Sequence, residues 1–213
     1  SNGNIVYSTA CPALHGVVER SFAPLYSYGG TDADFFCEED GVEGEWARLA
    51  LHLPGAESIT LRSRLFGEFN RANIAAAAAM ALRLGVSPNA LRRGVESFEG
   101  VKRRQELIYA RGKLRIYEDF AHHPTAIAGV ISMMRGRFPA SRLWAVYEPR
   151  SATSRRNVFQ NELPGAFSGA DIVLIKAPYK PDGIPEAERI DIARVVGDIN
   201  APGGRYSVNG VMV

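Results

Sequence analysis

The chain has 213 residues, a length that suits one large domain or two small ones. Hydrophobic residues make up 46 % of it and charged residues 23 %, and the formal net charge of +2 comes from basic and acidic residues spread along the sequence. This balance is ordinary for a globular protein and gives no basic stripe of the kind that binds nucleic acid.

Cysteine content and hydrophobic runs exclude two further classes. Cys11 and Cys37 are the only cysteines, too few for a disulfide framework or a metal cluster and typical of a reduced compartment. No apolar run reaches the ~20 residues that a membrane span requires, and no signal peptide stands at the start. We therefore expect a cytoplasmic protein, and the core-like strand at Asn4–Ser8 suggests a piece of a longer one.

Residues 1–66 are rich in expected strands. Short apolar runs at Ile5–Tyr7 and Leu25–Tyr28 flank a possible helix at His15–Ser21. Trp46–Leu53 and Ser58–Leu65 both alternate apolar and polar side chains, which is the period of a half-buried strand. Because Pro54-Gly55 marks a turn between them, the two runs predict a β-hairpin.

Residues 67–97 are expected to be helical. Asn73–Leu84 consists almost entirely of helix-forming residues, and Gly85 stands where a helix C-terminal glycine belongs. Ser87-Pro88 predicts the start of a second helix that runs to about Ser97, with serine as the N-cap and proline in the first turn.

Residues 98–213 alternate between expected strands and helices. The strands are Leu114–Glu118, Leu143–Glu148, Asp171–Ala177 and Arg205–Val208, and the helices are Pro124–Arg137, Asn157–Phe167 and Ile190–Val196. This alternation predicts an α/β fold with a doubly wound, mostly parallel, Rossmann-like sheet. We place the domain boundary near Ser97–Gly100, which gives domains of residues 1–97 and 98–213.

The first candidate site is Glu118–Thr125, between an expected strand and the following helix. Ligands of open α/β sheets bind beyond the carboxyl ends of the strands. Asp119 could bind ribose hydroxyls there, and His122 and His123 could meet a phosphate or stack on a base. The alternative is a polar turn in which Thr125 or Asp119 caps the helix.

Two more polar clusters have comparable positions. Glu148–Arg156 follows a strand and contains three arginines and three hydroxyl side chains, which suit carboxylate or phosphate recognition, although a solvated loop has the same composition. Gly67–Asn73 precedes the alanine-rich helix, where Asn70 and Asn73 could contact adenine or Asn70 could be an N-cap.

Several catalytic motifs are absent from the sequence. It contains no G-x-x-x-x-G-K-[ST] phosphate loop, because Leu114 follows the only Gly-Lys pair, Gly112-Lys113. It also contains no Cys/His metal spacing and no G-x-S-x-G nucleophile motif. The sequence therefore offers no phosphate loop of the kind that holds ATP phosphates.

The three clusters, in this order and spacing, resemble the Mur ligase family of peptidoglycan metabolism. Gly67-x-x-Asn70-x-x-Asn73, the segment from Gly100 to Arg104, and Asp119-Phe120-Ala121-His122-His123-Pro124-Thr125 carry the resemblance. It implies that residues 1–97 form the end of an α/β P-loop-type central ATPase domain and that residues 98–213 form a C-terminal Rossmann-like domain.

The resemblance also implies an ATP-dependent amide ligase that uses Mg²⁺, with the metal ligands upstream of residue 1. ATP contacts would come from Asn70, Asn73, Arg104, Asp119 and His123, and contacts to the incoming peptide from His122, Arg150, Ser151 and Thr153. No residue is assigned as a catalytic nucleophile or a metal ligand, and neither nucleic acid nor membrane is expected as a partner.

Two amine donors remain open within the muramate-accepting branch. Phe120 and Glu148-Pro149-Arg150-Ser151 resemble the member that joins the recycled murein tripeptide L-Ala-γ-D-Glu-meso-diaminopimelate to UDP-N-acetylmuramate. The member that joins L-alanine typically has tyrosine in place of Phe120, and Ala152 and Ser154–Arg156 depart from the expected pattern. A non-catalytic nucleotide-binding module is the alternative from another class.

Overall fold

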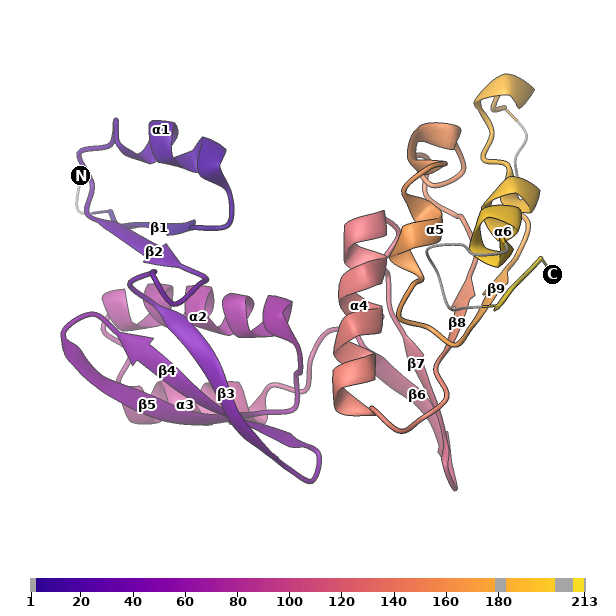
Figure 1. Ribbon diagram of the computed structural model, residues 1–213. Helices are drawn as coiled ribbons and strands as arrows, with labels where there is room; N and C mark the ends of the chain where they lie inside the picture. The colour runs from indigo at the N-terminus through magenta and orange to yellow at the C-terminus, as the bar shows by residue number, and fades with distance from the viewer. Residues whose placement is uncertain (1–2, 179–182, 202–208, 213) are drawn as a thin grey trace. The chain divides into compact units, whose positions relative to one another are not determined.

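The computed structural model describes residues 3–178, 183–201 and 209–212, which form two compact units, Ser1–Lys102 and Arg103–Val213 (Figure 1). The units divide between Lys102 and Arg103. Both combine helices with sheets, which is the α/β class that the sequence predicts.

The first unit opens with a small parallel pair of strands. β1 (Ile5–Ser8) pairs in register with β2 (Leu25–Tyr28), and the 3₁₀ turn η1 (Pro12–Leu14) and the short helix α1 (His15–Val18) connect them. The helix is shorter than the expected His15–Ser21. Its single buried side chain is Val18, so little packing would support further turns.

An antiparallel sheet with the order β3-β4-β5 forms the main part of the first unit. Its strands are β3 (Phe36–Glu43), β4 (Trp46–Leu53) and β5 (Ala56–Ser63). The expected hairpin is confirmed, and β3 adds an edge strand that the sequence did not indicate. Ala47, Leu49 and Leu51 are fully buried, as strict alternation predicts for a strand with one face on a core.

Two helices pack on this sheet, α2 (Glu68–Arg83) against β3 and α3 (Pro88–Ser97) against β5. Gly85 ends α2 with a φ of 86°, and the amides of Gly85 and Val86 donate back to Leu82 and Ala81. That pair of bonds is a Schellman motif. Ser87 caps α3 by accepting a hydrogen bond from the Ala90 amide, at 3.3 Å, as expected.

The second unit contains a parallel sheet with the order β10-β9-β8. Its strands are β8 (Trp144–Tyr147), β9 (Ile172–Ile175) and β10 (Asn209–Met212). The helices are α4 (Pro124–Arg137), α5 (Leu163–Ala166) and α6 (Ile192–Asn200), and α4 has the expected bounds. The strand expected at Arg205–Val208 lies outside the described residues.

One hydrophobic core unites this sheet and its helices. Its buried members come from α4 to α6, from β8 and β9, and from the segments beside them, and they include Ile127, Ile131, Tyr147, Leu163, Phe167, Val173, Ile175, Val195 and Ile199. Because helices and strands far apart in sequence share this core, it fixes the ends of β8 and β9 relative to the start of α4.

Two expectations for this unit are wrong in detail. The first concerns Leu114–Glu118, which forms a strand with the expected bounds but was expected in the parallel sheet. β7 (Leu114–Glu118) pairs antiparallel with β6 (Glu106–Arg111), a strand that the sequence did not indicate. Gly112 closes this hairpin in a two-residue turn with a φ of 58°. In the described part of the chain, β7 pairs with no strand of the parallel sheet.

The expected helix at Asn157–Phe167 is broken into the 3₁₀ turn η2 (Asn157–Phe159) and α5. Pro164 has no amide hydrogen to continue a preceding helix. The side chain of Gln160 pairs reciprocally with the backbone of Asp191, at 3.0 and 2.8 Å, and so connects the segment after η2 to the start of α6. The chain's cysteines, Cys11 and Cys37, are free, and no helix among the described residues is long and apolar enough to cross a membrane.

Candidate functional site

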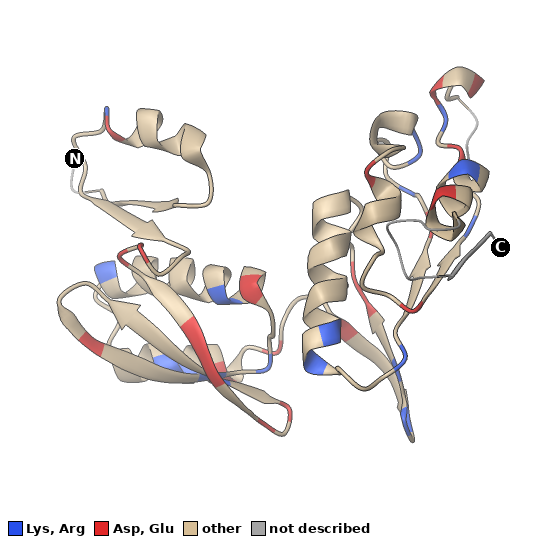
Figure 2. Cartoon of the chain, viewed as in Figure 1, with Lys and Arg blue, Asp and Glu red and all other residues tan. Residues whose placement is uncertain are grey.

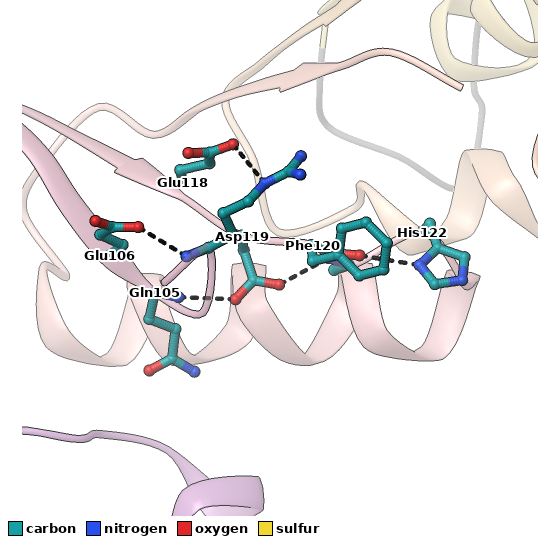
Figure 3. A network of polar contacts seen from close by, with 8 residues as sticks. Gln105, Glu106, Glu118, Asp119, Phe120 and His122 are labelled. Atoms are coloured by element: carbon teal, nitrogen blue, oxygen red, sulfur yellow. Dashed lines mark hydrogen bonds and ion pairs between the residues drawn. The ribbon is translucent and has the colours of Figure 1, made fainter. Parts of the chain in front are cut away.

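The loop between β7 and α4 is held by the carboxylate of Asp119 (Figure 3). Its Oδ2 accepts from the Gln105 amide at 2.9 Å, and its Oδ1 accepts from the Ala121 amide at 2.7 Å. The side chain therefore organises the backbone on both sides of it. Each oxygen keeps a lone pair that a ligand hydroxyl could use.

The two histidines of this loop have different surroundings. His123 is the N-cap of α4, where its Nδ1 accepts from the Thr125 amide at 3.3 Å. The alternative that Thr125 or Asp119 caps this helix is therefore wrong. His122 is exposed, and its Nδ1 lies 2.9 Å from the Phe120 carbonyl oxygen.

These partners assign opposite tautomers to the neutral rings. A carbonyl oxygen only accepts, so His122 carries its proton on Nδ1 and presents Nε2 as an acceptor. His123 accepts at Nδ1, so it carries its proton on Nε2 and presents a donor. Adjacent residues thus offer one acceptor and one donor beyond the end of β7.

Phe120 forms the aromatic part of the same loop and is 44 % exposed. The guanidinium groups of Arg103 and Arg104 lie 5.3 and 5.7 Å from its ring centroid, within the range of a cation–π contact. Its ring also meets that of His122 at 5.0 Å. Arg104, the candidate for a nucleotide contact, is therefore brought to the Glu118–Thr125 loop within one unit.

The loop after β8 is built around two serines. The Ser151 hydroxyl donates to Ser154 Oγ at 2.8 Å, and each serine amide donates to the other serine's hydroxyl at 3.0 Å. Ser154 is buried, and burial raises the pKa of the neighbouring Tyr147, with a smaller opposing effect from the Ser154 hydroxyl. This compact turn leaves Arg150 and Thr153 exposed at its edges.

Ion pairs anchor the two ends of this loop. Glu148 pairs with Lys176 at 3.3 Å, and Arg156 pairs with Glu188. Lys176 directly follows β9, so both partners of the first pair lie at carboxyl ends of the parallel strands. The position of Lys176 after a buried strand was the signal that could have identified it in the sequence.

A ring contact connects the two loops. The His123 ring meets Phe159 of η2 edge-on, with the centroids 4.5 Å apart. Phe159 lies a few residues beyond the serine turn, so the start of α4 and the segment after β8 belong to one neighbourhood of the second unit. The sequence did not indicate Phe159, because one aromatic residue in an expected helix carries no signal of such a contact.

The third cluster lies in the first unit. Gly67, at a φ of 90°, is the N-cap of α2, so the alternative that Asn70 caps the helix is wrong. The Asn70 side-chain amide donates to the Phe66 carbonyl at 2.9 Å, and Asn73 is exposed one turn further along. These two asparagines therefore belong to a different unit from the loops after β7 and β8.

The described residues have mixed surface charge and no cluster of potential metal ligands. Basic and acidic residues are interspersed over both units (Figure 2). In residues 3–178, 183–201 and 209–212, no group of three or more His, Cys, Asp or Glu side chains could hold a metal ion. We therefore assign no magnesium ligand to this part of the chain.

Sequence relatives of this chain include UDP-N-acetylmuramate–L-alanine ligases. It is 31 % identical over 160 residues to a UDP-N-acetylmuramate–L-alanine ligase of Pelagibacter ubique, a match that covers 72 % of this chain and 34 % of that protein. It is 32 % identical over 174 residues to the enzyme of that name from Stenotrophomonas maltophilia, covering 79 % and 36 %. The chain thus spans about a third of the length of these relatives. No family model matches it.

Two solved structures share its fold. A UDP-N-acetylmuramate–alanine ligase of Thermotoga maritima aligns with a TM-score of 0.67 at 16 % identity, covering 88 % of this chain and 39 % of that one. A murein peptide ligase of Psychrobacter arcticus aligns with a TM-score of 0.62 at 24 % identity, covering 100 % and 43 %. The expected Rossmann-like α/β fold agrees with both, and the similarity to the sequence relatives supports membership of the Mur ligase family.

Proposed function

We propose that this chain is the C-terminal part of an ATP-dependent ligase that forms an amide bond on UDP-N-acetylmuramate in cell-wall metabolism. The observation that carries the proposal is the similarity to UDP-N-acetylmuramate–L-alanine ligases, at 31–32 % identity over most of this chain. In this proposal residues 1–97 are the end of the central ATPase domain and residues 98–213 the C-terminal domain.

The proposed reaction begins when the muramyl carboxylate attacks the γ-phosphate of ATP and releases ADP. The resulting acyl phosphate is attacked by the amine of the incoming substrate, and the tetrahedral intermediate expels phosphate and leaves the amide. This chemistry needs positioning and charge stabilisation more than a protein nucleophile. The arginines and hydrogen-bonding loops of the second unit suit that requirement.

Two groups of residues would hold the substrates. Arg104, with its guanidinium over Phe120, and the Nε2–H of His123 are donors for the nucleotide, and Asp119 keeps acceptor capacity for ribose hydroxyls. Asn70 and Asn73 would contact adenine from the first unit. The incoming amine donor would meet His122, Arg150, Ser151 and Thr153 around the exposed edges of the two loops.

We propose the murein tripeptide as the amine donor. Phe120 and the run Glu148–Ser151 support it. L-alanine is the second candidate, because the sequence relatives named above are L-alanine ligases. Arg150 favours the larger substrate, since its exposed guanidinium can bind a carboxylate. The tripeptide has several carboxylates, whereas free L-alanine has one.

Amide formation by the ligase that contains this chain tests both proposals. With ATP, Mg²⁺ and UDP-N-acetylmuramate, we expect turnover with the tripeptide to exceed that with L-alanine. Arg150→Ala should raise KM for the tripeptide about tenfold, the loss of one charge-assisted contact, and leave KM for ATP unchanged. Arg111→Ala, an exposed arginine in the β6–β7 hairpin, is the matched control and should change neither.

The outcomes test the choice of amine donor, the role of Arg150 and the ligase reaction independently. Preference for L-alanine would replace the tripeptide with the second candidate. Equal rises in both KM values would remove the role of Arg150. Absence of product with either donor, despite ATP, would contradict the ligase proposal. The 213-residue chain alone should form no amide, because it has no phosphate loop.

A further inference from the structure

The turn from Arg103 to Gln105 has an unusual backbone. Arg103 has a φ of 60° and Gln105 a φ of 53°, and among the described residues these are the non-glycine residues with positive φ. Side chains with a Cβ atom occupy this left-handed region only when surrounding contacts hold them there. Some part of the fold must therefore fix this turn.

Those contacts come mainly from the end of β7 and the loop that follows it (Figure 3). The Phe120 amide donates to the Arg103 carbonyl at 2.8 Å, and the Gln105 amide donates to Asp119 Oδ2 at 2.9 Å. The Arg103 side chain pairs with Glu118 at 2.9 Å, and its amide donates to Glu106 at 2.7 Å. Both left-handed residues are thus bonded to neighbouring groups.

Asp119 differs from the other partners because it bonds two segments at once. Its second oxygen accepts from the Ala121 amide at 2.7 Å, so one carboxylate joins the turn to the loop that carries His122 and His123. Between the two left-handed residues stands Arg104, whose guanidinium reaches the Phe120 ring. The direction of the Arg104 side chain depends on the backbone that Asp119 holds.

We propose that Asp119 is a positioning residue: it fixes the left-handed turn Arg103–Gln105 and thereby places Arg104 beside Phe120. The part of this inference that concerns a nucleotide rests on the proposed function, since it takes Arg104 as the contact to ATP. The part that concerns the turn rests on the hydrogen bonds and backbone angles alone. In this role Asp119 acts through the Gln105 and Ala121 backbone amides, whether or not its remaining lone pairs also meet a ribose hydroxyl.

The test exploits the different needs of glycine and glutamine at position 105. Glycine adopts a positive φ without steric cost, so Gln105→Gly should keep the turn with less help from the carboxylate. We would compare the wild-type 213-residue chain with Asp119→Ala, Gln105→Gly and the double variant. Lys113→Gly, an exposed position in the β6–β7 turn without a positive φ, replaces Gln105→Gly in a control double variant.

The readout is hydrogen exchange of the Phe120 amide, which bonds to Arg103 and not to Asp119. Asp119→Ala should accelerate it about tenfold, since a bond to a charged acceptor contributes at least that factor, and Gln105→Gly should restore most of the protection. Asp119→Asn, which keeps one acceptor oxygen, should give a smaller acceleration and serves if the alanine variant does not fold. Unchanged exchange, or equal rescue by Lys113→Gly, would overturn the proposal.

A second measurement separates this inference from the proposed function. In the ligase that contains the chain, Asp119→Ala should raise KM for ATP with little change in kcat, and Gln105→Gly should bring KM back. Gln105→Gly cannot restore a direct ribose contact by Asp119, so the rescued part of the KM change measures the positioning role, and no rescue at all would overturn it. If the exchange result holds but KM for ATP never moves, the turn is as proposed and the nucleotide role of Arg104 fails.

Discussion

The two three-stranded sheets of this chain are assembled in different ways. β3, β4 and β5 are consecutive in sequence and antiparallel, so each strand finds its partner through a short turn. β8, β9 and β10 are parallel, and helices and long loops separate them. In the first sheet the pairing is local. In the second, a shared core must bring distant segments together, and the polar loops at the strand ends are placed by that core.

Truncations in the two cores should have the largest effects on stability, and each should act on its own unit. Phe167, which is 1 % exposed and meets the Tyr147 ring at 5.6 Å, supports the parallel sheet. Phe167→Ala should cost about 3–5 kcal/mol, and Leu49→Ala, at a fully buried position in β4, about 2–5 kcal/mol. Trp46 and Trp144 are the chain's two tryptophans, one in each unit, so urea unfolding of single-tryptophan variants reports each unit separately.

We expect each truncation to shift the transition of its own unit and leave the other nearly unchanged. Val158→Ala, at a 56 % exposed position of the second unit, is the control and should cost less than about 0.5 kcal/mol. Equal shifts of both tryptophan signals would mean that the two units unfold as one, and the contrast between them would not extend to stability.

Removing the N-cap side chains of α6 and α3 should have smaller effects on stability. Asp191 Oδ1 accepts from the Arg194 amide at 2.9 Å at the start of α6, whereas the Ser87 hydroxyl accepts from Ala90 at 3.3 Å at the start of α3. Asp191→Ala should cost about 1 kcal/mol and Ser87→Ala about 0.5 kcal/mol, since a carboxylate also interacts favourably with the helix dipole. Thermal unfolding of both variants measures this, and Asp191→Asn, which can still cap, should recover most of the loss. A larger loss from Ser87→Ala would reverse the predicted order.

The smallest expected effect is a pH dependence in the second unit. Asp171 accepts from Arg135 at 2.7 Å and from the Leu143 amide at 2.6 Å, and these bonds, the arginine first, lower the pKa of its carboxyl. Because the folded-state pKa is the lower one, the stabilisation is complete above the unfolded value of about 3.9 and is lost as the pH falls through the folded value.

Asp171→Asn checks this sign. At pH 6 the free energy of unfolding of the wild type should exceed that of the variant by less than about 1 kcal/mol, because Asp171 and Arg135 are 42 % and 32 % exposed. This difference should shrink below pH 4. Urea unfolding between pH 3 and pH 6, followed through Trp144, measures it. An advantage that grows towards pH 3 would contradict the lowered pKa.

The sequence was most informative where structure is local. Alternation in Trp46–Leu53 predicted β4, Ser87-Pro88 predicted the start of α3, and Pro124–Arg137 was predicted with the bounds that α4 has. It was least informative where tertiary contacts decide. Pro164 and the Gln160–Asp191 pairing divide an expected helix, and β6 has an irregular pattern that alternation does not reveal.

The candidate site follows the same division. The position of Glu118–Thr125 after a strand identified His122 and His123 as candidates, and the structure gives each a defined partner. The partners of Asp119 could not be predicted, because a left-handed arginine and glutamine have no signature in sequence. Glycine would have signalled such a turn, but residues 103 and 105 are not glycine.

The turn at Arg103–Gln105 also sets a limit on how the second unit can be produced or exchanged alone. Gln105 and Asp119 are 14 residues apart, and the turn stands at the first residues of the unit. A recombinant product that began at Glu106, where the first regular strand starts, would omit the donor to Asp119 Oδ2 and the carbonyl that receives the Phe120 amide. Domain swaps between this chain and its relatives should therefore join before Arg103, so that both halves of this contact come from the same parent.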